Sequence, residues 1–307
     1  MRTVHDPQIM DPGLRGASAA IGNFDGVHLG HQKVIDLARG RGPLGVVTFE
    51  PHPRSYFAPD APAFRLMNAQ ARANRLEKLG VEVLFELPFG PDLAAHTAEA
   101  FVGDVLAGAL GLSHVVVGAD FRFGQGRVGD AEGLQKIGAA HALDVTVAEL
   151  LSGDHGAVSS TRIRTALTEG RPREAAQMLG HWHRIEGPVL HGDKRGRTIG
   201  YPTINMALDG LHLPRLGVYA VLVDVLTGAH AGSYRGVASL GIRPMFRLDV
   251  PNLETFLFDF TGDLYDAHVS VALVEFLRPE AKFDGLDALV TQMDADSAAA
   301  RVALEVA

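Results

Sequence analysis

The sequence predicts an α/β fold in two domains: an N-terminal Rossmann-like domain with a parallel sheet, and a C-terminal antiparallel β-barrel domain with a terminal helix. Three observations predict it. Short apolar runs alternate with helical patterns early in the chain, which is typical of βαβ units and a parallel sheet. Turn-rich segments later separate strand-like runs without intervening helices. Finally, 307 residues is long for one hydrophobic core. We expect the domains at residues 1–183 and 184–307.

The elements of the N-terminal domain follow from hydrophobic periodicity. Each strand candidate is a short apolar run, and each helix candidate repeats apolar residues at helical spacing. We expect strands at Ala17–Gly22, Leu44–Phe49, Val83–Leu87, His114–Gly118 and Asp144–Leu150, with helices at His31–Arg39, Ala69–Leu79, Thr97–Leu110 and Glu132–Ala142. Ligands of parallel sheets usually bind at the carboxyl ends of the strands, so we expect the chemistry there.

The C-terminal domain shows a different pattern. Its apolar runs are bounded by turn residues rather than by helices, which indicates an antiparallel barrel or sandwich. We expect strands at Ile185–His191, Gly217–Leu226, Tyr234–Gly241, Glu254–Phe260 and His268–Leu277, and a closing helix at Leu286–Val306. The domains meet near a helix at Pro172–Leu179.

Composition and charge limit the partners of the chain. Hydrophobic residues make up 47% and charged residues 21%, as in compact folded domains. The net charge of −8 argues against a general nucleic-acid binder, which needs a basic face. No stretch approaches the ~20 apolar residues of a membrane span, the N-terminus resembles no secretion signal, and cysteine is absent. We expect a cytoplasmic monomer or weak homo-oligomer that acts on small molecules and binds neither nucleic acid nor membrane.

The strongest motif lies where the first strand leads into a helix, in Ile21-Gly-Asn-Phe-Asp-Gly-Val-His-Leu-Gly-His31. A helix N-terminus favours phosphate, and glycines let a ligand approach the backbone closely. Two imidazoles there could stabilise charge as the α-phosphorus of a nucleotide is attacked. A lone histidine could equally be a satisfied polar residue, and a zinc pair would need further ligands. The phosphate-binding candidates are Gly22, Asn23, Phe24, Asp25 and Gly30, and the catalytic candidates are His28 and His31.

A second anion-binding candidate is Val158-Ser-Ser-Thr-Arg-Ile-Arg164, which opens a helix. One interpretation is that a serine merely caps this helix. Three hydroxyls in a row, with an arginine one turn later, make a denser anion site than a cap needs. We therefore expect phosphate binding by Ser159, Ser160, Thr161 and Arg164.

A dinucleotide fingerprint also occurs, in Gly124-Gln-Gly-Arg-Val-Gly129, before an expected helix. The loop Asp120–Phe123 separates it from the preceding strand, and it follows the fourth strand rather than the first. We do not expect this match to bind a dinucleotide.

A third cluster lies in the C-terminal domain, in Gly192-Asp-Lys-Arg-Gly-Arg-Thr-Ile-Gly-Tyr-Pro-Thr-Ile-Asn205. Its glycines could fold a flap over phosphates, with Gly192, Gly196 and Arg197 as ATP-binding candidates. Thr203 and Asn205 offer hard oxygen ligands suited to Mg²⁺. The alternative is a basic, solvated hairpin.

Glu254 is the candidate general base of the C-terminal domain. In a strand, its side chain points to the same face as those of Phe256, Phe258 and Phe260. Partial desolvation by these rings makes a carboxylate a stronger base, which suits proton abstraction from a hydroxyl. The alternative is an acid at the strand end paired with Arg243 or Arg247.

These motifs together resemble the prokaryotic bifunctional riboflavin kinase/FAD synthetase family over nearly the whole chain. Gly22 to His31 is similar to the HxGH signature of nucleotidyltransferases, and residues 159–164 to their Ser-Ser-Thr-x-x-Arg motif. The resemblance implies phosphorylation of riboflavin to FMN by the C-terminal domain, and transfer of AMP from ATP to FMN by the N-terminal domain. It also implies ATP as co-substrate, Mg²⁺ as cofactor, and Glu254 as the catalytic glutamate.

Two further loops match the family. The loop after the second strand, Thr48-Phe-Glu-Pro-His-Pro53, precedes Phe57, which the resemblance makes a candidate flavin contact. The loop after the fourth strand carries Asp120 and Phe121, also assigned to flavin binding, although Asp120 suits a turn equally well.

Departures from the family pattern lie mainly in the kinase half. Met245 replaces a usual threonine, Ser239 a frequent asparagine, and Ile204 a small residue. Because of these departures, the alternative remains that the chain is a flavin-binding protein in which only the adenylyltransferase is active. Another nucleotidyltransferase substrate, as in cytidylyltransferases, would leave Pro202–Asn205 and Glu254 unexplained.

Overall fold

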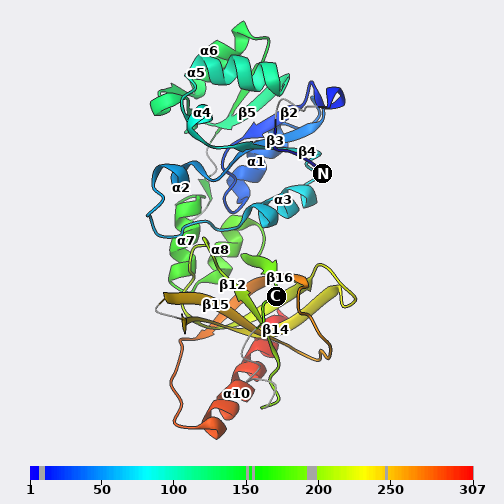
Figure 1. Ribbon diagram of the computed structural model, residues 1–307, viewed down its shortest axis with the longest axis vertical. Helices are drawn as coiled ribbons and strands as arrows, with labels where there is room; N and C mark the ends of the chain where they lie inside the picture. Colours follow the sequence, from blue (N-terminus) through cyan, green and yellow to red (C-terminus); the bar gives the residue numbers. More distant parts are fainter. Residues whose placement is uncertain (7–10, 150–151, 154–155, 192–198, 246–247, 307) are drawn as a thin grey trace. The chain divides into compact units, whose positions relative to one another are not determined.

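The computed structural model describes residues 1–6, 11–149, 152–153, 156–191, 199–245 and 248–306. They form two compact units (Figure 1). The first unit comprises Met1–Pro62 and Arg72–Ser159, and the second comprises Ala63–Ala71 and Ser160–Ala307. The expected domain boundary between residues 183 and 184 stays a prediction. Within the described residues, no helix has both the length and the apolar composition needed to cross a membrane.

A six-stranded parallel sheet forms the centre of the first unit, as predicted. The strand order is β1-β4-β3-β2-β5-β8. The strands are β1 (Arg2–Val4), β2 (Ser18–Ile21), β3 (Leu44–Glu50), β4 (Val83–Pro88), β5 (His114–Gly118) and β8 (Asp144–Ala148). The apolar runs are buried along β2, β3, β4 and β5, as expected for strands covered on both faces. The strand β1 was not predicted, because an edge strand of three residues carries no apolar run.

Helices cover this sheet and complete its core. They are α1 (Leu29–Leu37), α2 (Pro53–Phe57), α3 (Ala69–Lys78), α4 (Pro91–Ala94), α5 (Ala98–Ala100), the π-helix η3 (Phe101–Ala109) and α6 (Ala131–Ala140), with a short 3₁₀ turn η2 (Pro12–Leu14). The main apolar cluster joins alternate residues of the strands to η3 and α6. The helix expected at Thr97–Leu110 consists of two parts. Thr97 caps the short helix α5, and the chain then continues as the π-helix η3.

Two small hairpins project from the first unit: β6 (Arg122–Phe123) with β7 (Gly129–Asp130), and β9 (Ser152–Gly153) with β10 (Gly156–Ala157). The dinucleotide fingerprint falls in the first of them. Gly124 and Gly126 have positive φ angles and the 3₁₀ turn η4 (Gln125–Arg127) joins the two strands. The glycines therefore form a hairpin loop rather than the strand-to-helix turn that is typical of a dinucleotide fingerprint.

A six-stranded antiparallel sheet forms the second unit, in the order β11-β16-β13-β14-β15-β12. A bridge between Leu190 and Asn205 links its two ends, so the sheet is a nearly closed barrel, as predicted. The strands are β11 (Arg184–Pro188), β12 (Thr203–Ala207), β13 (Gly217–Val225), β14 (Gly232–Met245), β15 (Leu248–Leu257) and β16 (His268–Arg278). The strand β12 was missed, because its residues alternate poorly and follow a glycine-rich run.

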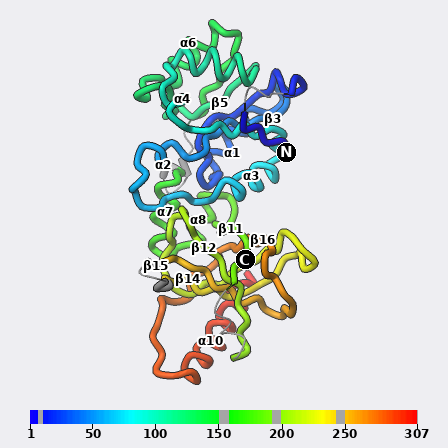
Figure 2. Tube along the Cα trace, viewed as in Figure 1, coloured from blue at the N-terminus to red at the C-terminus, as the bar shows by residue number. Residues whose placement is uncertain are grey.

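Helices and a separate chain segment complete the second unit. The helix α10 (Leu286–Glu305) follows an extended segment and packs on β13, β14 and β16 (Figures 1 and 2). Arg278 fixes it through two hydrogen bonds to Asp296, 2.8 and 2.6 Å long. The other helices are α7 (Ser160–Thr168) and α8 (Pro172–Leu179). The segment Ala63–Ala71 joins this unit through a bridge between Arg65 and Leu211.

A buried histidine in the second unit predicts how its stability depends on pH. His183 lies just before β11 and is 4% exposed. Burial, with smaller contributions from His212 and His181, lowers its pKa to about 3. In the unfolded chain, His183 has its ordinary pKa of about 6.5. Below that pH the unfolded chain therefore binds a proton at His183 that the folded chain does not bind, and this favours unfolding. The stabilisation from a neutral His183 is therefore complete above about pH 6.5 and is lost as the pH falls towards 3.

We predict that His183→Gln removes this pH dependence. The difference in free energy of unfolding between the natural protein and the variant should fall by about 2 kcal/mol between pH 6.5 and pH 5. A difference of one bound proton changes the free energy of unfolding by about 1.4 kcal/mol per pH unit. Urea unfolding followed by the fluorescence of Trp182, the one tryptophan of the chain, reports on this unit. Parallel pH profiles for the two proteins would contradict the prediction.

Candidate active sites

The chain between β2 and α1 forms a loop with a strained backbone. Phe24 and Val27 have positive φ angles of 50° and 43°, and that of Gly26 is 86°. A non-glycine residue in this region costs roughly 1–3 kcal/mol and persists only where its surroundings hold it. Here the Val27 N–H donates to the Phe24 carbonyl (3.2 Å), and the Gln32 amide of α1 donates to the Val27 carbonyl (2.9 Å). The result is a preformed turn leading into α1, with the side chain of Asp25 nearly buried.

The two predicted histidines meet at the start of α1. His28 is the N-cap residue, and its Nδ1 accepts the backbone N–H of His31 (3.3 Å). The two rings are stacked, with centroids 3.6 Å apart and planes 13° from parallel. A Cβ atom on Gly30 would lie 3.2 Å from the His28 ring, which explains a glycine between them. The structure thus places both imidazoles at a helix N-terminus.

His31 is held in its neutral form. Burial, together with the neighbouring His28 ring, keeps the pKa of His31 well below its usual value of 6.5. Its Nδ1 is buried and has no hydrogen-bond partner among the described residues. A buried polar atom without a partner is costly, so a polar ligand arriving there would be favoured. An anion beside the ring would also raise its pKa, because it stabilises the charged form.

The predicted Ser-Ser-Thr-x-x-Arg segment falls on both sides of the boundary between the units. The Val158 carbonyl lies 3.9 Å from a Cβ built on Gly30, so the residue before Ser159 reaches the start of α1. The remaining residues of the motif, Ser160, Thr161 and Arg164, lie on α7 in the second unit.

Arg164 is anchored within the second unit. Its Nε donates to the Phe64 carbonyl (2.6 Å), and its guanidinium lies 5.4 Å from the centre of the Phe64 ring. These contacts hold the Arg164 side chain in place within the second unit.

An aromatic cluster surrounds the predicted flavin contact Phe57, which ends α2. The Phe57 ring is 66% exposed, yet it packs against Tyr56 and Phe89, with centroids 5.1 and 5.7 Å away. Phe89 in turn packs against Phe49 at the end of β3 (5.9 Å). A large exposed ring held by its neighbours is a suitable surface for another planar ring.

The loop after β5 contains the other predicted flavin residues. The Phe121 N–H donates to the Gly118 carbonyl (3.0 Å), so Asp120 sits exposed in a tight turn. The Phe121 ring stacks on Phe123, with centroids 5.6 Å apart. The turn-forming role of Asp120, which the sequence left open, fits this geometry.

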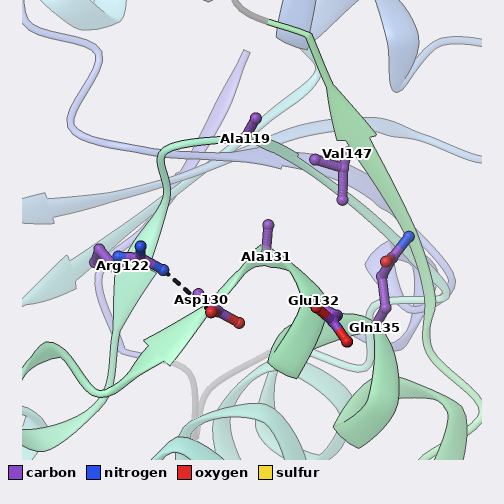
Figure 3. A pocket seen from close by; sticks show the side chains of 7 residues that line it. All are labelled: Ala119, Arg122, Asp130, Ala131, Glu132, Gln135 and Val147. Atoms are coloured by element: carbon purple, nitrogen blue, oxygen red, sulfur yellow. Dashed lines mark ion pairs between the residues drawn. The ribbon is translucent and has the colours of Figure 1, made fainter.

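A cavity of about 360 Å³ lies beside this loop (Figure 3). It is lined by Ala119, Arg122, Asp130, Ala131, Glu132, Gln135 and Val147. Arg122 and Asp130 form an ion pair on its wall (3.3 Å), so this cation is already partly neutralised. Ala119 and Arg122 flank Asp120 and Phe121 in the chain.

The second site lies on one face of the barrel. In the antiparallel pairing of β12 with β15, Asn205 is opposite Glu254 and Thr203 is opposite Phe256. Directly opposed residues point to the same face, so the predicted metal ligands and the predicted base share it. The alternation of Glu254 with Phe256 is as predicted, and both side chains are half-buried. Beyond the strand end at Leu257, Phe258 is buried.

Asn252 connects the polar residues of this face. Its amide nitrogen donates to Asn205 Oδ1 (3.2 Å) and to Glu254 Oε1 (3.3 Å). An amide group has two N–H donors and can satisfy both acceptors at once. Asn252 therefore orients the Glu254 carboxylate and the Asn205 amide oxygen relative to each other.

The first residues of β12 are held from outside the sheet. Tyr201 lies two residues before Thr203, and its ring contacts Phe256, with centroids 4.8 Å apart. The Tyr201 hydroxyl donates to the carboxylate of Asp294 on α10. The terminal helix thus helps to position the strand that carries Thr203 and Asn205.

Some predicted residues lie outside the described part of the chain. These are Gly192, Gly196 and Arg197 of the proposed flap, and Arg247. Of Arg243 and Met245 only the backbone is described, with Met245 paired to Leu248 across β14 and β15.

Sequence reasoning missed two residues of these sites. Asn252 lies two residues before Glu254, so its place on the same face follows from strand alternation once the strand is known to extend that far. Arg72 lies on α3, is 1% exposed, and bonds to the carbonyl of Asn23 in the first site (3.5 Å). Nothing in its local sequence distinguishes it from Arg75, the other arginine of that helix.

Comparisons with known proteins identify the family of both parts of the chain. Residues 11–162 match the family model of FAD synthetase, and residues 179–304 match that of riboflavin kinase. A bifunctional riboflavin kinase/FMN adenylyltransferase from Pseudomonas fluorescens is 41% identical, covering 98% of this chain and 97% of its own. The protein of that name from Escherichia coli K12 is 38% identical, covering 93% of this chain and 92% of its own.

A solved structure from Streptococcus pneumoniae, which bears the name of a macrolide-efflux protein, is also similar. Its TM-score is 0.83 at 32% identity, over 97% of this chain and 98% of its own. The chain belongs to the bifunctional riboflavin kinase/FMN adenylyltransferase family, which uses ATP both to phosphorylate riboflavin to FMN and to adenylylate FMN to FAD.

Proposed function

We propose that the face shared by β12 and β15 is the riboflavin kinase site, and that the start of α1 is the FMN adenylyltransferase site. The observation that carries this assignment is the Asn252 amide, which joins Asn205 to Glu254. This contact brings a candidate base and a candidate metal ligand together, and phosphoryl transfer uses both kinds of group.

In the kinase reaction, Glu254 takes the proton of the ribityl 5′-hydroxyl of riboflavin. The oxygen attacks the γ-phosphorus of ATP, the bond to the β,γ-bridging oxygen breaks, and FMN and ADP result. Asn252 orients the carboxylate for this proton transfer. Gly192, Gly196 and Arg197 would contact the ATP phosphates.

In the adenylyl transfer, an FMN phosphate oxygen attacks the α-phosphorus of ATP, and pyrophosphate leaves without a covalent enzyme intermediate. His28 and His31 donate to the phosphates as negative charge develops. Gly22, Asn23, Phe24, Asp25 and Gly30 shape the phosphate-binding turn, and Ser159, Ser160, Thr161 and Arg164 supply further donors. Phe57, Asp120 and Phe121 contact the flavin.

Mg²⁺ would be held by Thr203 and Asn205 together with the ATP phosphates. Both residues offer uncharged oxygen ligands on one face, and the Asn205 side chain is 6% exposed with its Oδ1 already oriented by Asn252. Mg²⁺ prefers such hard oxygen ligands and usually keeps several waters. The ion would neutralise phosphate charge during transfer.

We further propose a cytoplasmic protein that is a monomer or a weak homo-oligomer, with riboflavin, FMN and ATP as its partners and no nucleic acid. The net charge of −8 supports the last point. The alternative is a flavin-binding protein with only the adenylyltransferase active; riboflavin and MgATP that yield no FMN with the natural chain would favour it.

We predict that His31→Ala lowers the rate of FAD formation from FMN by about 10²–10³-fold, because a donor to the developing charge is lost. FMN formation from riboflavin by the same preparation should stay unchanged, since it uses the second unit. Chromatographic separation of FMN and FAD over time measures both. Normal FAD formation would overturn the assignment of the first site.

We predict the opposite pattern for Glu254→Gln. Loss of the base should lower FMN formation by about 10²–10⁴-fold and spare FAD formation from added FMN. Asp209→Asn, which removes a carboxylate from an exposed turn of the same unit, is the matched control and should leave both rates unchanged. Equal activity of Glu254→Gln and Asp209→Asn would exclude Glu254 as the base.

We predict that Asn205→Ala raises the Mg²⁺ concentration needed for half-maximal FMN formation by about tenfold or more, since lost metal-site contacts typically cost this much affinity. The Mg²⁺ dependence of FAD formation serves as the internal control, because it belongs to the other site. A variant whose two Mg²⁺ profiles both match those of the natural protein would contradict the role of Asn205.

A further inference from the structure

Arg72 is the most deeply buried charged residue described in the first unit. It lies on α3 and is 1% exposed. Its Nη2 donates to Glu86 Oε2 (2.6 Å) and to Glu50 Oε2 (3.0 Å), and its Nη1 lies 3.5 Å from the Asn23 carbonyl oxygen. A buried charge is tolerated only when partners of this kind surround it.

The three acceptors of Arg72 come from three neighbouring strands. Glu86 is on β4, Glu50 ends β3, and Asn23 lies two residues after the end of β2. These strands are adjacent in the sheet order β4-β3-β2, and all run parallel. One guanidinium therefore links the carboxyl-terminal parts of three neighbouring strands. Ligands of such folds bind at the carboxyl ends of the strands.

The Asn23 carbonyl is the anchor of the strained turn. It accepts from the Thr48 hydroxyl (3.3 Å) as well as from Arg72. Phe24, with its positive φ, comes directly after it, and His28 comes four residues after Phe24. A strained turn keeps its shape only if its surroundings over-determine it, so the position of Asn23 affects where the two imidazoles lie.

The shape of the guanidinium suits this task. It offers N–H donors in a rigid plane, so it can reach carboxylates and a carbonyl in different directions at once. A lysine ammonium is a compact charge on a flexible stem and lacks that fork. Arg72 is buried and its two terminal nitrogens bond to protein groups, so we assign it no contact with the substrates.

We propose that Arg72 is a positioning residue for adenylyl transfer, which holds the Asn23–Val27 turn, and with it His28 and His31, in the reactive arrangement. This inference rests on the proposed role of the histidine pair. It concerns the placement of the donors, whereas the charge of Arg72 is neutralised by Glu86 and Glu50.

The first experiment compares Arg72→Lys with the natural protein. We expect kcat for FAD formation to fall at least tenfold with little change in KM for ATP, because misplaced donors lose transition-state contacts more than ground-state binding. FMN formation in the same sample should stay within twofold. Lys78→Met, an exposed cation further along α3, is the matched control and should keep both rates. An unchanged kcat for Arg72→Lys would overturn the proposal.

A second variant separates positioning from loss of folding. Arg72→Met alone would leave Glu86 buried without its cation, so it is combined with Glu86→Gln. Where urea unfolding of this double variant matches the natural protein, we expect FAD formation still to be reduced at least tenfold. Full FAD formation by a double variant that unfolds normally would overturn the proposal.

A third measurement follows the histidine ring directly. In the natural protein, NMR titration should place the midpoint of His31 well below 6.5, since burial lowers its pKa. In Arg72→Lys we expect that midpoint to rise towards 6.5 as the turn loosens, and an identical titration curve would count against the proposal. If His31→Ala itself forms FAD normally, the assignment of the site fails; if only the Arg72 variants do, the positioning role alone fails.

Discussion

Strand pairing in a fixed register is the constraint on which both sites depend. Main-chain N–H and C=O groups inside a sheet must pair, and once they do, side chains alternate between its two faces. In the barrel, this register places Asn205 opposite Glu254 and leaves Asn252 on the same face. A slip of one residue would turn each of these side chains to the opposite face. In the parallel sheet, the same constraint brings the ends of β2, β3 and β4 to one edge, where a single guanidinium reaches Asn23, Glu50 and Glu86.

The ionisable side chains of the two sites have different surroundings. In the first unit, burial keeps His31 neutral and leaves its Nδ1 without a partner, so the ring gains a proton readily only beside an anion. The fixed positive charge, Arg72, is instead placed behind the turn and neutralised by carboxylates. In the barrel, an uncharged amide orients Glu254.

Apolar runs predicted the large elements well because their signal is local. The strands β3, β4 and β5 are buried along almost their whole length, so their composition alone distinguishes them. Elements with weaker local signals were missed or misjudged. The strand β1 owes its existence to pairing with β4, and β12 to pairing with β15. The helix expected at Thr97–Leu110 continues as a π-helix after a short α-helical turn, and helical periodicity does not distinguish the two.

The sequence by itself determined the two fold classes, the histidine pair at a helix start, and the identity of Glu254 as the candidate base. Each of these depends on residues close together in the chain, and the periodicity of a helix or a strand gives the relative positions of such residues. The tertiary structure alone decided that Asn252 joins Glu254 to Asn205, and that Arg72 supports the turn before His28. Those contacts join strands and a helix up to 49 residues apart, and only the register of the sheets brings such residues within hydrogen-bonding distance.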